Sequence, residues 1–157
     1  MRIGQSIDIH QLTQGDYITL GGVQIPCEFA LVAHSDGDAL IHAIAESILG
    51  ALALKDLGTH FPDTDPKYKG ADSLTLLAHV VELMEERNYC IGNIDSLILI
   101  EKPKMAPHLD AMKANISRVC HCNLDQVNVK ATRGEKLGFV GKSEGVVATA
   151  VVLLNEK

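Results

Sequence analysis

The stretch Arg2-Ile-Gly-Gln-Ser-Ile-Asp-Ile-His10 opens the chain, and we expect a first β-strand over 3–10. Residues i and i+2 of a strand point to the same face, so Asp8 and His10 would lie side by side. His42 begins an apolar helical stretch further along the chain. One carboxylate and two imidazoles form a ligand set for a divalent metal and leave a coordination position for a substrate oxygen. A pair of solvated surface side chains is the alternative that this spacing leaves open.

The remaining pattern predicts a mixture of strands and helices. Gly21-Gly22 separates two short alternating runs, which is typical of a two-residue hairpin turn. We expect strands at 17–20, 23–25, 91–101, 127–132 and 146–154, the last buried on both faces. We expect helices at 38–54 (N-cap Ser35), from 73 onward and at 105–119, and a loop over 59–72. The fold class is α/β (α+β mixed sheet), with about three helices on one sheet face, a small β-hairpin, and an oligomer contact over the other face.

Composition and charge narrow the class of protein. The chain has 157 residues, 46% hydrophobic and 22% charged, which predicts one globular domain over 1–157. No transmembrane stretch and no secretory signal is recognisable, so we expect a cytoplasmic protein with no membrane partner. The net charge of −6 argues against a nucleic-acid partner. A phosphorylated substrate would therefore be held by metals and a few lysines.

A second group with metal-binding side chains is Cys120-His121-Cys122. Structural zinc sites usually leave about two to four residues between paired cysteines, a spacing that this group lacks. Because the cytosol keeps thiols reduced, we expect these two cysteines to be buried or half-buried thiols, like Cys27 and Cys90.

Two acidic residues near His42 carry alternative interpretations. Asp38 and His42 are four positions apart on the predicted helix, so Asp38 can accept the proton of the imidazole nitrogen that does not bind metal. A carboxylate that only caps the helix is the other interpretation. Asp36, like Asp38, argues against a phosphate site at this helix start and favours capping.

Two further segments carry groups suited to an anionic ligand. Lys104 lies at a strand-to-helix junction, where it would bind an anionic or heteroaromatic ligand or form a solvated basic turn. The stretch 131–136 follows a strand end, which is where α/β sheets tend to bind ligands. Glu135 is there a candidate ligand for a second metal, and Arg133 and Lys136 can offset phosphate charge.

Taken together, these stretches resemble one family, the 2-C-methyl-D-erythritol 2,4-cyclodiphosphate synthases. The matching stretches run in family order over nearly the whole chain: Arg2-Ile-Gly4, Asp8-Ile-His10, Gly21-Gly22-Val23, Ala33-His-Ser-Asp-Gly-Asp38 with His42, Asp56-Leu-Gly58, Phe61-Pro-Asp-Thr-Asp-Pro66, Lys69-Gly-Ala-Asp-Ser73, Pro103-Lys-Met105, Val127-Asn-Val-Lys-Ala-Thr132, Glu135-Lys-Leu-Gly-Phe139 and Glu144-Gly145. The resemblance implies a lyase of the methylerythritol phosphate route to isoprenoids. It would convert 4-diphosphocytidyl-2-C-methyl-D-erythritol 2-phosphate to the cyclic diphosphate and release CMP.

The resemblance also implies roles for individual residues. Asp8, His10 and His42 would hold Zn²⁺, and Glu135 would hold Mg²⁺ or Mn²⁺. The catalytic residues would be His34, Arg133 and Glu135. Substrate would be bound by Asp8, His10, His34, Ser35, Asp56, Gly58, Phe61, Asp63, Asp65, Ile100, Lys104, Met105, Ala106, Ala131, Thr132, Arg133, Phe139 and Lys142. The family is a homotrimer with sheets facing the three-fold axis and active sites between subunits.

The chain departs from the family at three positions. Arg133 stands where the family usually has Thr, and we expect its charge to assist the reacting phosphate. Ile7 replaces the usual Phe, and Lys142 replaces the usual Arg. These two positions line the central cavity where relatives can hold an isoprenoid diphosphate, so the departures argue against that ligand here.

Two other functions fit the same metal set. A metal-dependent phosphohydrolase would use water as the nucleophile and release phosphate, not CMP. A trimeric binding protein on this scaffold would bind nucleotide without turnover.

Overall fold

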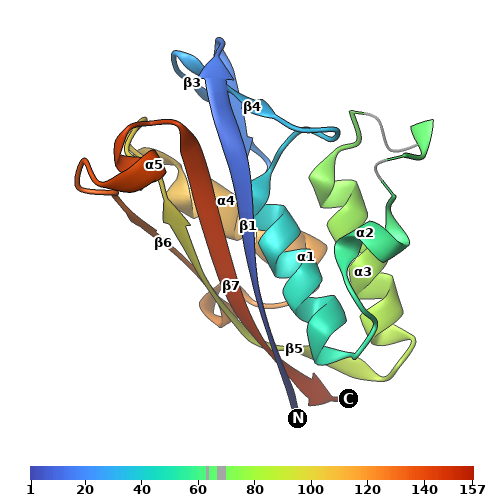
Figure 1. Ribbon diagram of the computed structural model, residues 1–157. Coiled ribbons are helices and arrows are strands. Elements are labelled where there is room, and N and C mark those ends of the chain that lie inside the picture. Colours follow the sequence, from blue (N-terminus) through green and yellow to red (C-terminus); the bar gives the residue numbers. More distant parts are fainter. Residues whose placement is uncertain (63, 67–69) are drawn as a thin grey trace.

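The molecule is built around a five-stranded mixed sheet with the strand order β4-β1-β7-β5-β6 (Figure 1). The computed structural model describes residues 1–62, 64–66 and 70–157. The strands of this sheet are β1 (Arg2–Gln14), β4 (Phe29–Val32), β5 (Tyr89–Leu99), β6 (Val127–Thr132) and β7 (Gly145–Glu156). The β5–β6 pair is parallel and the other pairs are antiparallel, which confirms the predicted mixed sheet.

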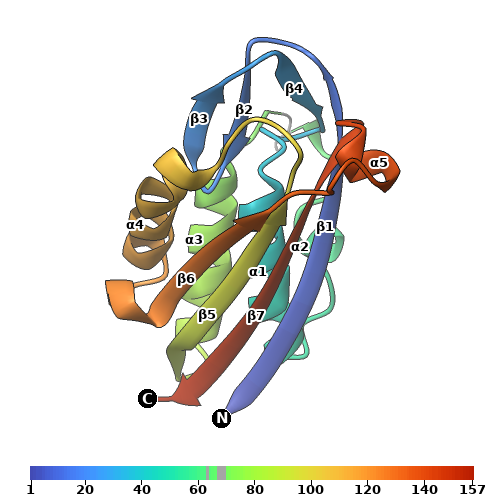
Figure 2. The same ribbon diagram turned by 90° about the vertical axis from the view of Figure 1, so that its left-hand side faces the viewer.

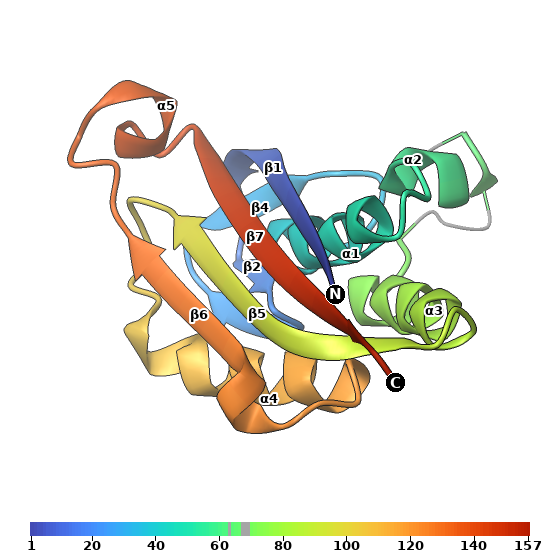
Figure 3. The same ribbon diagram turned by 90° about the horizontal axis from the view of Figure 1, so that it is seen from below.

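Helices cover one face of this sheet, and Figures 2 and 3 show the other face open. The covering helices are α1 (Ala39–Ala51), α3 (Ser73–Glu85) and α4 (Leu109–Val119). Shorter elements are α2 (Leu57–His60), α5 (Gly138–Gly141), η2 (Ala106–His108) and η3 (Leu124–Gln126). This arrangement confirms the predicted layer of helices on a single face.

Alternation along β1 decides which side chains face the helices. Ser6 and Leu12 are buried on the helix side, whereas Ile3, Ile7 and Ile9 on the opposite side are 70%, 54% and 53% exposed. Gly4 lies on the helix side, where an added Cβ would lie 1.9 Å from the main-chain oxygen of Ser47 in α1. The absence of a side chain at this position therefore lets the helix rest directly on the strand.

The central strand β7 is buried over its first four residues, as predicted. On the helix side burial continues through Val152 and Leu154, which are 0% exposed. On the other side Val151 is 40% exposed, so burial on both faces does not extend along the whole strand within one chain. We call the outward side chains Ile3, Ile7, Ile9 and Val151 the open face.

The predicted hairpin is present as β2 (Tyr17–Leu20) and β3 (Val23–Pro26). Gly21 and Gly22 between them have φ values of 60° and 69°, a region that glycine enters without steric cost. The hairpin forms a separate two-stranded sheet beside α4, as shown in Figure 2.

Some predicted boundaries are wrong. The first helix begins after Asp38, which is its N-cap in place of Ser35, and it ends at Ala51 rather than 54. The predicted loop over 59–72 overlaps the short helix α2 at its start. The predicted helix at 105–119 begins as a 3₁₀ turn, η2, before α4. Strand β4 was not predicted.

Candidate metal centre and second pocket

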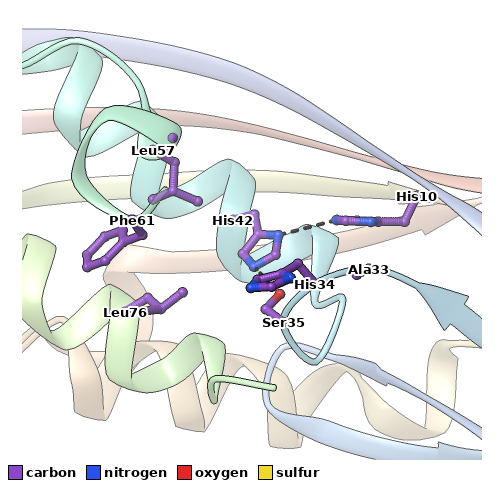
Figure 4. A pocket seen from close by; sticks show the side chains of 9 residues that line it. His10, Ala33, His34, Ser35, His42, Leu57, Phe61 and Leu76 are labelled. Carbon is purple, nitrogen blue, oxygen red and sulfur yellow. Dashed lines mark hydrogen bonds between the residues drawn. The ribbon is translucent and has the colours of Figure 1, made fainter. Parts of the chain in front are cut away.

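The three predicted zinc ligands converge at one point between β1 and α1. Asp8 Oδ2 lies 2.9 Å from His10 Nε2 and 3.1 Å from His42 Nδ1. The two imidazole nitrogens are 3.3 Å apart, as the dashed line in Figure 4 marks. Among the residues that the structure describes, this is the only cluster of three His, Cys, Asp or Glu side chains whose ligand atoms lie close enough to share an ion. An oxygen and two imidazole nitrogens suit a divalent transition metal.

The electrostatics of this cluster keep its carboxylate ionised. Burial acts to raise the pKa of Asp8, but hydrogen bonds from His10 and His42 and their charges outweigh it and hold that pKa well below its usual range. Burial acts to lower the pKa of His10, and the hydrogen bond and charge of Asp8 raise it overall. A negative group held close to two imidazoles is an arrangement that attracts a cation.

The outward nitrogens of both imidazoles also have partners. His10 Nδ1 lies 3.3 Å from the main-chain oxygen of Val32. His42 Nε2 lies 2.9 Å from Ser73 Oγ and 3.2 Å from Ser35 Oγ. Such outer contacts orient imidazole ligands toward a metal.

Of the two interpretations of Asp38, the structure supports helix capping and not a contact with the His42 imidazole. The carboxylate of Asp38 is fully buried and accepts hydrogen bonds from the main-chain nitrogens of Gly21 (2.9 Å), Gly22 (2.7 Å) and Ile41 (3.0 Å). Burial raises the pKa of Asp38 to about 6, against these hydrogen bonds, which lower it. Asp38 therefore caps α1, in agreement with the capping interpretation, and also holds the turn of the hairpin against the start of that helix.

A cavity of about 390 Å³ opens beside the metal cluster (Figure 4). Six predicted site residues line it: His10, His34, Ser35, His42, Gly58 and Phe61. Ala33, Leu57 and Leu76 complete its lining and were not predicted as site residues. The cavity thus combines an apolar wall with imidazole and hydroxyl groups, which suits a small phosphorylated ligand.

The other site residues predicted near this cavity, Asp56 and Asp65, do not line it. Asp56 caps α2, where its carboxylate accepts hydrogen bonds from Thr59 N (2.8 Å) and Thr59 Oγ1 (2.7 Å), and these bonds hold its pKa below the usual value. Asp65 is not part of the cavity lining, and its main-chain nitrogen donates to the oxygen of Pro62. Asp63 lies outside the described residues.

A second pocket, of about 200 Å³, lies at the ends of the parallel strands β5 and β6. The resemblance implies that 100–106 and 131–133 bind the cytidine diphosphate end of the substrate, and all of these residues except Lys102 line the pocket. Seven of them are among the predicted substrate-binding residues: Ile100, Lys104, Met105, Ala106, Ala131, Thr132 and Arg133. Glu101, Pro103 and Leu109 complete the lining. The carboxyl ends of parallel strands are the usual ligand-binding edge of such sheets, as expected.

The second pocket adjoins a basic cavity. Lys102, Lys104, Arg133 and Lys136 line this cavity of about 660 Å³ together with Glu28 and Glu101, so basic side chains outnumber acidic ones at the edge of the second pocket. The second pocket and the metal cavity share no lining residue. Glu135 lines neither of them and is exposed, at a φ of 53°.

The predicted substrate-binding residue Phe139 and the two residues predicted for the central cavity, Ile7 and Lys142, lie outside both pockets. Phe139 belongs to α5 and is 43% exposed, with its ring packed over Gly145. Lys142 is the C-cap of α5. Ile7 lies on the open face. None of these residues lines the metal cavity or the second pocket.

Sequence reasoning missed Asp36 and Ser73 as parts of the site. Ser73 was assigned no role in the site, yet it is 0% exposed and its hydroxyl reaches His42. A serine at the predicted start of a helix was the available signal, but the sequence shows neither its burial nor the histidine that it meets. The cysteines are free thiols, buried at Cys120 and half-buried at the other positions, as predicted.

Comparisons with known proteins agree on one family. The model of the YgbB family matches residues 1–155. The 2-C-methyl-D-erythritol 2,4-cyclodiphosphate synthase of Ectopseudomonas mendocina (strain ymp) is 56% identical over 98% of both chains. That of Azotobacter vinelandii is 53% identical over the same shares.

Solved structures give the same result. The bifunctional IspDF from Campylobacter jejuni matches 99% of this chain with a TM-score of 0.95 and 38% identity, and this chain covers 42% of it. IspF from Plasmodium falciparum, solved as a CDP complex, has a TM-score of 0.88 and 37% identity over 99% of this chain and 96% of its own.

Proposed function

The chain belongs to the YgbB family, and from that membership we propose that it acts as a 2-C-methyl-D-erythritol 2,4-cyclodiphosphate synthase. Such an enzyme is a lyase of isoprenoid biosynthesis that releases CMP from 4-diphosphocytidyl-2-C-methyl-D-erythritol 2-phosphate. The observation that carries the proposal is the convergence of Asp8, His10 and His42 beside the metal cavity.

The reaction is a phosphoryl transfer within one molecule. An oxygen of the 2-phosphate forms a bond to the β-phosphorus, the bond from that phosphorus to the bridging oxygen breaks, and CMP leaves with the electron pair. The nucleophile is already ionised, so the chain need supply no strong base. Its tasks are to fold the substrate, offset charge and exclude water.

The metal cavity is suited to these tasks. Asp8, His10 and His42 would hold Zn²⁺, which when bound supplies positive charge against the β-phosphate. His34 and Ser35 would contact the phosphates, with His34 assisting the transfer. The apolar side chains of Leu57, Phe61 and Leu76 in the cavity lining would keep water from competing with the internal nucleophile.

The second pocket would hold the cytidine diphosphate end of the substrate. The solved relative in complex with CDP supports a nucleotide of this kind. Lys104 and Arg133 line the pocket and would offset the charge of the phosphates. Glu135 would hold a second divalent ion, Mg²⁺ or Mn²⁺, near the α- and β-phosphates.

A homotrimer would bring the two pockets together. The pockets share no residue within one chain, so a site built from both is most simply formed between neighbouring copies. The open face, with Ile3, Ile7, Ile9 and Val151 exposed, offers the apolar surface for that assembly. In this trimer Ile7 and Lys142 would face the central cavity, and both argue against an isoprenoid diphosphate there.

The proposal includes the organisation and location of the chain. A single domain over 1–157 is supported by one continuous cluster of buried hydrophobic side chains that draws on both sheets and on α1, α3 and α4. In the part of the chain that the structure describes, no helix is long and apolar enough to cross a membrane. Cytoplasmic location and the absence of a nucleic-acid partner stay predictions.

The test is ³¹P NMR of the purified protein with the cytidyl 2-phosphate substrate and Mg²⁺, with and without a zinc chelator. We expect paired cyclic diphosphate signals together with CMP, both lost on chelation. Free phosphate without a cyclic product would support the phosphohydrolase. Unchanged substrate in metal-loaded protein that still binds CDP would support the binding protein.

A further inference from the structure

We propose that Ser73 and Asp36 are positioning residues that fix which nitrogen of His42 carries hydrogen, and so prepare Nδ1 to bind a divalent metal. The inference rests on the metal site of the proposed function. It adds two residues that do not touch the metal, and it assigns to each a defined hydrogen-bonding role.

The contacts form a chain from Asp36 through Ser73 to His42. Ser73 is the first residue of α3, is 0% exposed, and donates its hydroxyl hydrogen to Asp36 Oδ1 in a short hydrogen bond. The main-chain nitrogen of Ser73 donates to Asp36 Oδ2 at 3.1 Å. Asp36 N donates in turn to the oxygen of Ala71 at 3.2 Å, so the two segments are joined at Ala71 as well as at Ser73. Ser73 Oγ lies 2.9 Å from His42 Nε2.

The direction of each hydrogen bond follows from the donors available. An ionised carboxylate only accepts, so the single hydroxyl hydrogen of Ser73 points to Asp36. Ser73 Oγ can then only accept from His42, which requires hydrogen on Nε2. A neutral imidazole carries one N–H, so the lone pair lies on Nδ1, the nitrogen that faces Asp8 Oδ2 and His10 Nε2. That lone pair is what a metal needs.

The opposite tautomer is disfavoured by the same contacts. Hydrogen on Nδ1 of His42 would satisfy Asp8 at 3.1 Å in the absence of metal. It would also place the lone pair of Nε2 2.9 Å from an oxygen of Ser73 that has no hydrogen to offer, which leaves the more distant hydroxyl of Ser35, at 3.2 Å, as the donor to that nitrogen. His10 shows the same arrangement with a main-chain acceptor, because the oxygen of Val32 faces its Nδ1 and leaves Nε2 for the metal.

The first experiment measures the Zn²⁺ affinity of the purified full-length protein by competition with a chelating dye. Ser73→Ala removes the acceptor and should weaken Zn²⁺ binding by about 10- to 100-fold. Asp36→Asn keeps the size of the side chain but can donate to Ser73 Oγ, which frees the hydroxyl to donate to Nε2 and favours the wrong tautomer. We expect at least the same loss of affinity.

The matched control is Asp72→Asn. Asp72 caps the same helix by accepting a hydrogen bond from Leu74 N at 2.9 Å, and this substitution removes the same charge. Because Asp72 Oδ1 bonds to that helix end and not to Ser73 Oγ, the control should leave the affinity unchanged. In the double variant, Asp36→Asn should add little once Ser73→Ala is present, since both act through one hydroxyl.

A spectroscopic measurement separates this role from a merely structural one. In ¹⁵N-labelled protein without metal, at a pH where His42 is neutral, we expect the Nε2–H tautomer in the wild type and a shift toward Nδ1–H in Asp36→Asn. A wild type in the Nδ1–H form overturns the inference whether or not zinc binds. Variants that bind Zn²⁺ as tightly as a zinc-binding wild type also overturn it and leave the proposed metal site intact. A wild type that has the Nε2–H tautomer but binds no Zn²⁺ would contradict the proposed function alone.

Discussion

The metal cavity and the second pocket differ in how much of each is built by one chain. In the metal cavity, the side chains of His10 and His42 are only 16% and 12% exposed, and both of their nitrogens have partners. In the second pocket, Lys104 and Arg133 are exposed, and Glu135 stands outside the pocket. The metal cavity is therefore already ordered within one chain. The second pocket is open to solvent, and we expect a ligand or a neighbouring copy to complete it.

The largest expected effect tests the metal cavity. His42→Ala should abolish Zn²⁺ binding and lower turnover by at least about 10³-fold, because a lost metal costs several kcal/mol of charge stabilisation. Metal analysis and the ³¹P assay measure both. His121→Asn, which alters a surface histidine paired with Glu85, should change neither. Near-normal turnover in His42→Ala would contradict the assignment of this cluster.

A mixing experiment tests whether the second pocket depends on a neighbouring copy. His42→Ala and the double variant Lys104→Ala/Arg133→Ala damage different pockets, and each alone should be reduced by at least about 10²-fold. Subunits of the two variants, dissociated and reassembled together, should regain measurable turnover, because some interfaces then combine an intact metal cavity with an intact second pocket. If the mixture stays as inactive as its parents, the two pockets do not cooperate between chains.

Arg133 gives a smaller and more specific effect. Arg133→Thr should lower turnover by about 10-fold, because it removes a charge from the edge of the second pocket. Arg133→Lys keeps the charge and should retain more activity. Steady-state kinetics of the two variants distinguish the contributions of charge and shape. Unchanged turnover in Arg133→Thr would rule out a role in the reaction.

The smallest effect concerns the strands that carry the second pocket. The hydrogen bond from Lys130, on β6, holds the pKa of Asp95, on β5, below its usual value. A carboxylate whose pKa is lower in the folded state stabilises the fold at any pH above its unfolded-state pKa. This stabilisation is lost as the pH falls through the folded-state pKa. Asp95→Asn should therefore lower the free energy of unfolding by at most about 0.5 kcal/mol at neutral pH, and by nothing in strong acid. Urea titrations measure this, and an altered Zn²⁺ affinity would show that the two regions are coupled.

Much of the fold was predictable because the signals are local. The glycine pair of the hairpin, the alternation of β6 and the apolar stripe of α3 each follow from spacing alone. Strand β4 was missed because Phe29–Val32 is short and does not alternate, and pairing with β1 defines it. The extension of β1 to Gln14 depends on that same pairing.

The candidate site was predictable where the spacing of residues along a strand fixes the face to which their side chains point. Asp8 and His10 share a face because they are two apart on a strand, and the structure brings both to His42. For Asp38 the sequence left capping and a contact with His42 open, because a spacing of four brings side chains together only within a helix. Asp38 is the N-cap of α1, and its side chain turns toward a hairpin that is distant in sequence. The contact of Ser73 with His42 spans 31 positions, and no local pattern reports it.

The bare backbone at Gly4 has a consequence for the spacing of the three candidate metal ligands. Two of the ligands stand on β1 and the third on α1, and these elements touch where an added Cβ would lie 1.9 Å from Ser47 O. Because Gly4 has no Cβ, β1 and α1 pack against each other with no side chain between them at this position. A methyl group at this position would push β1 and α1 apart. It would thereby increase the distance between His42 on α1 and the two ligands on β1, although it contacts none of them. The spacing of the three candidate ligands therefore depends on how strand and helix pack as well as on the ligands themselves.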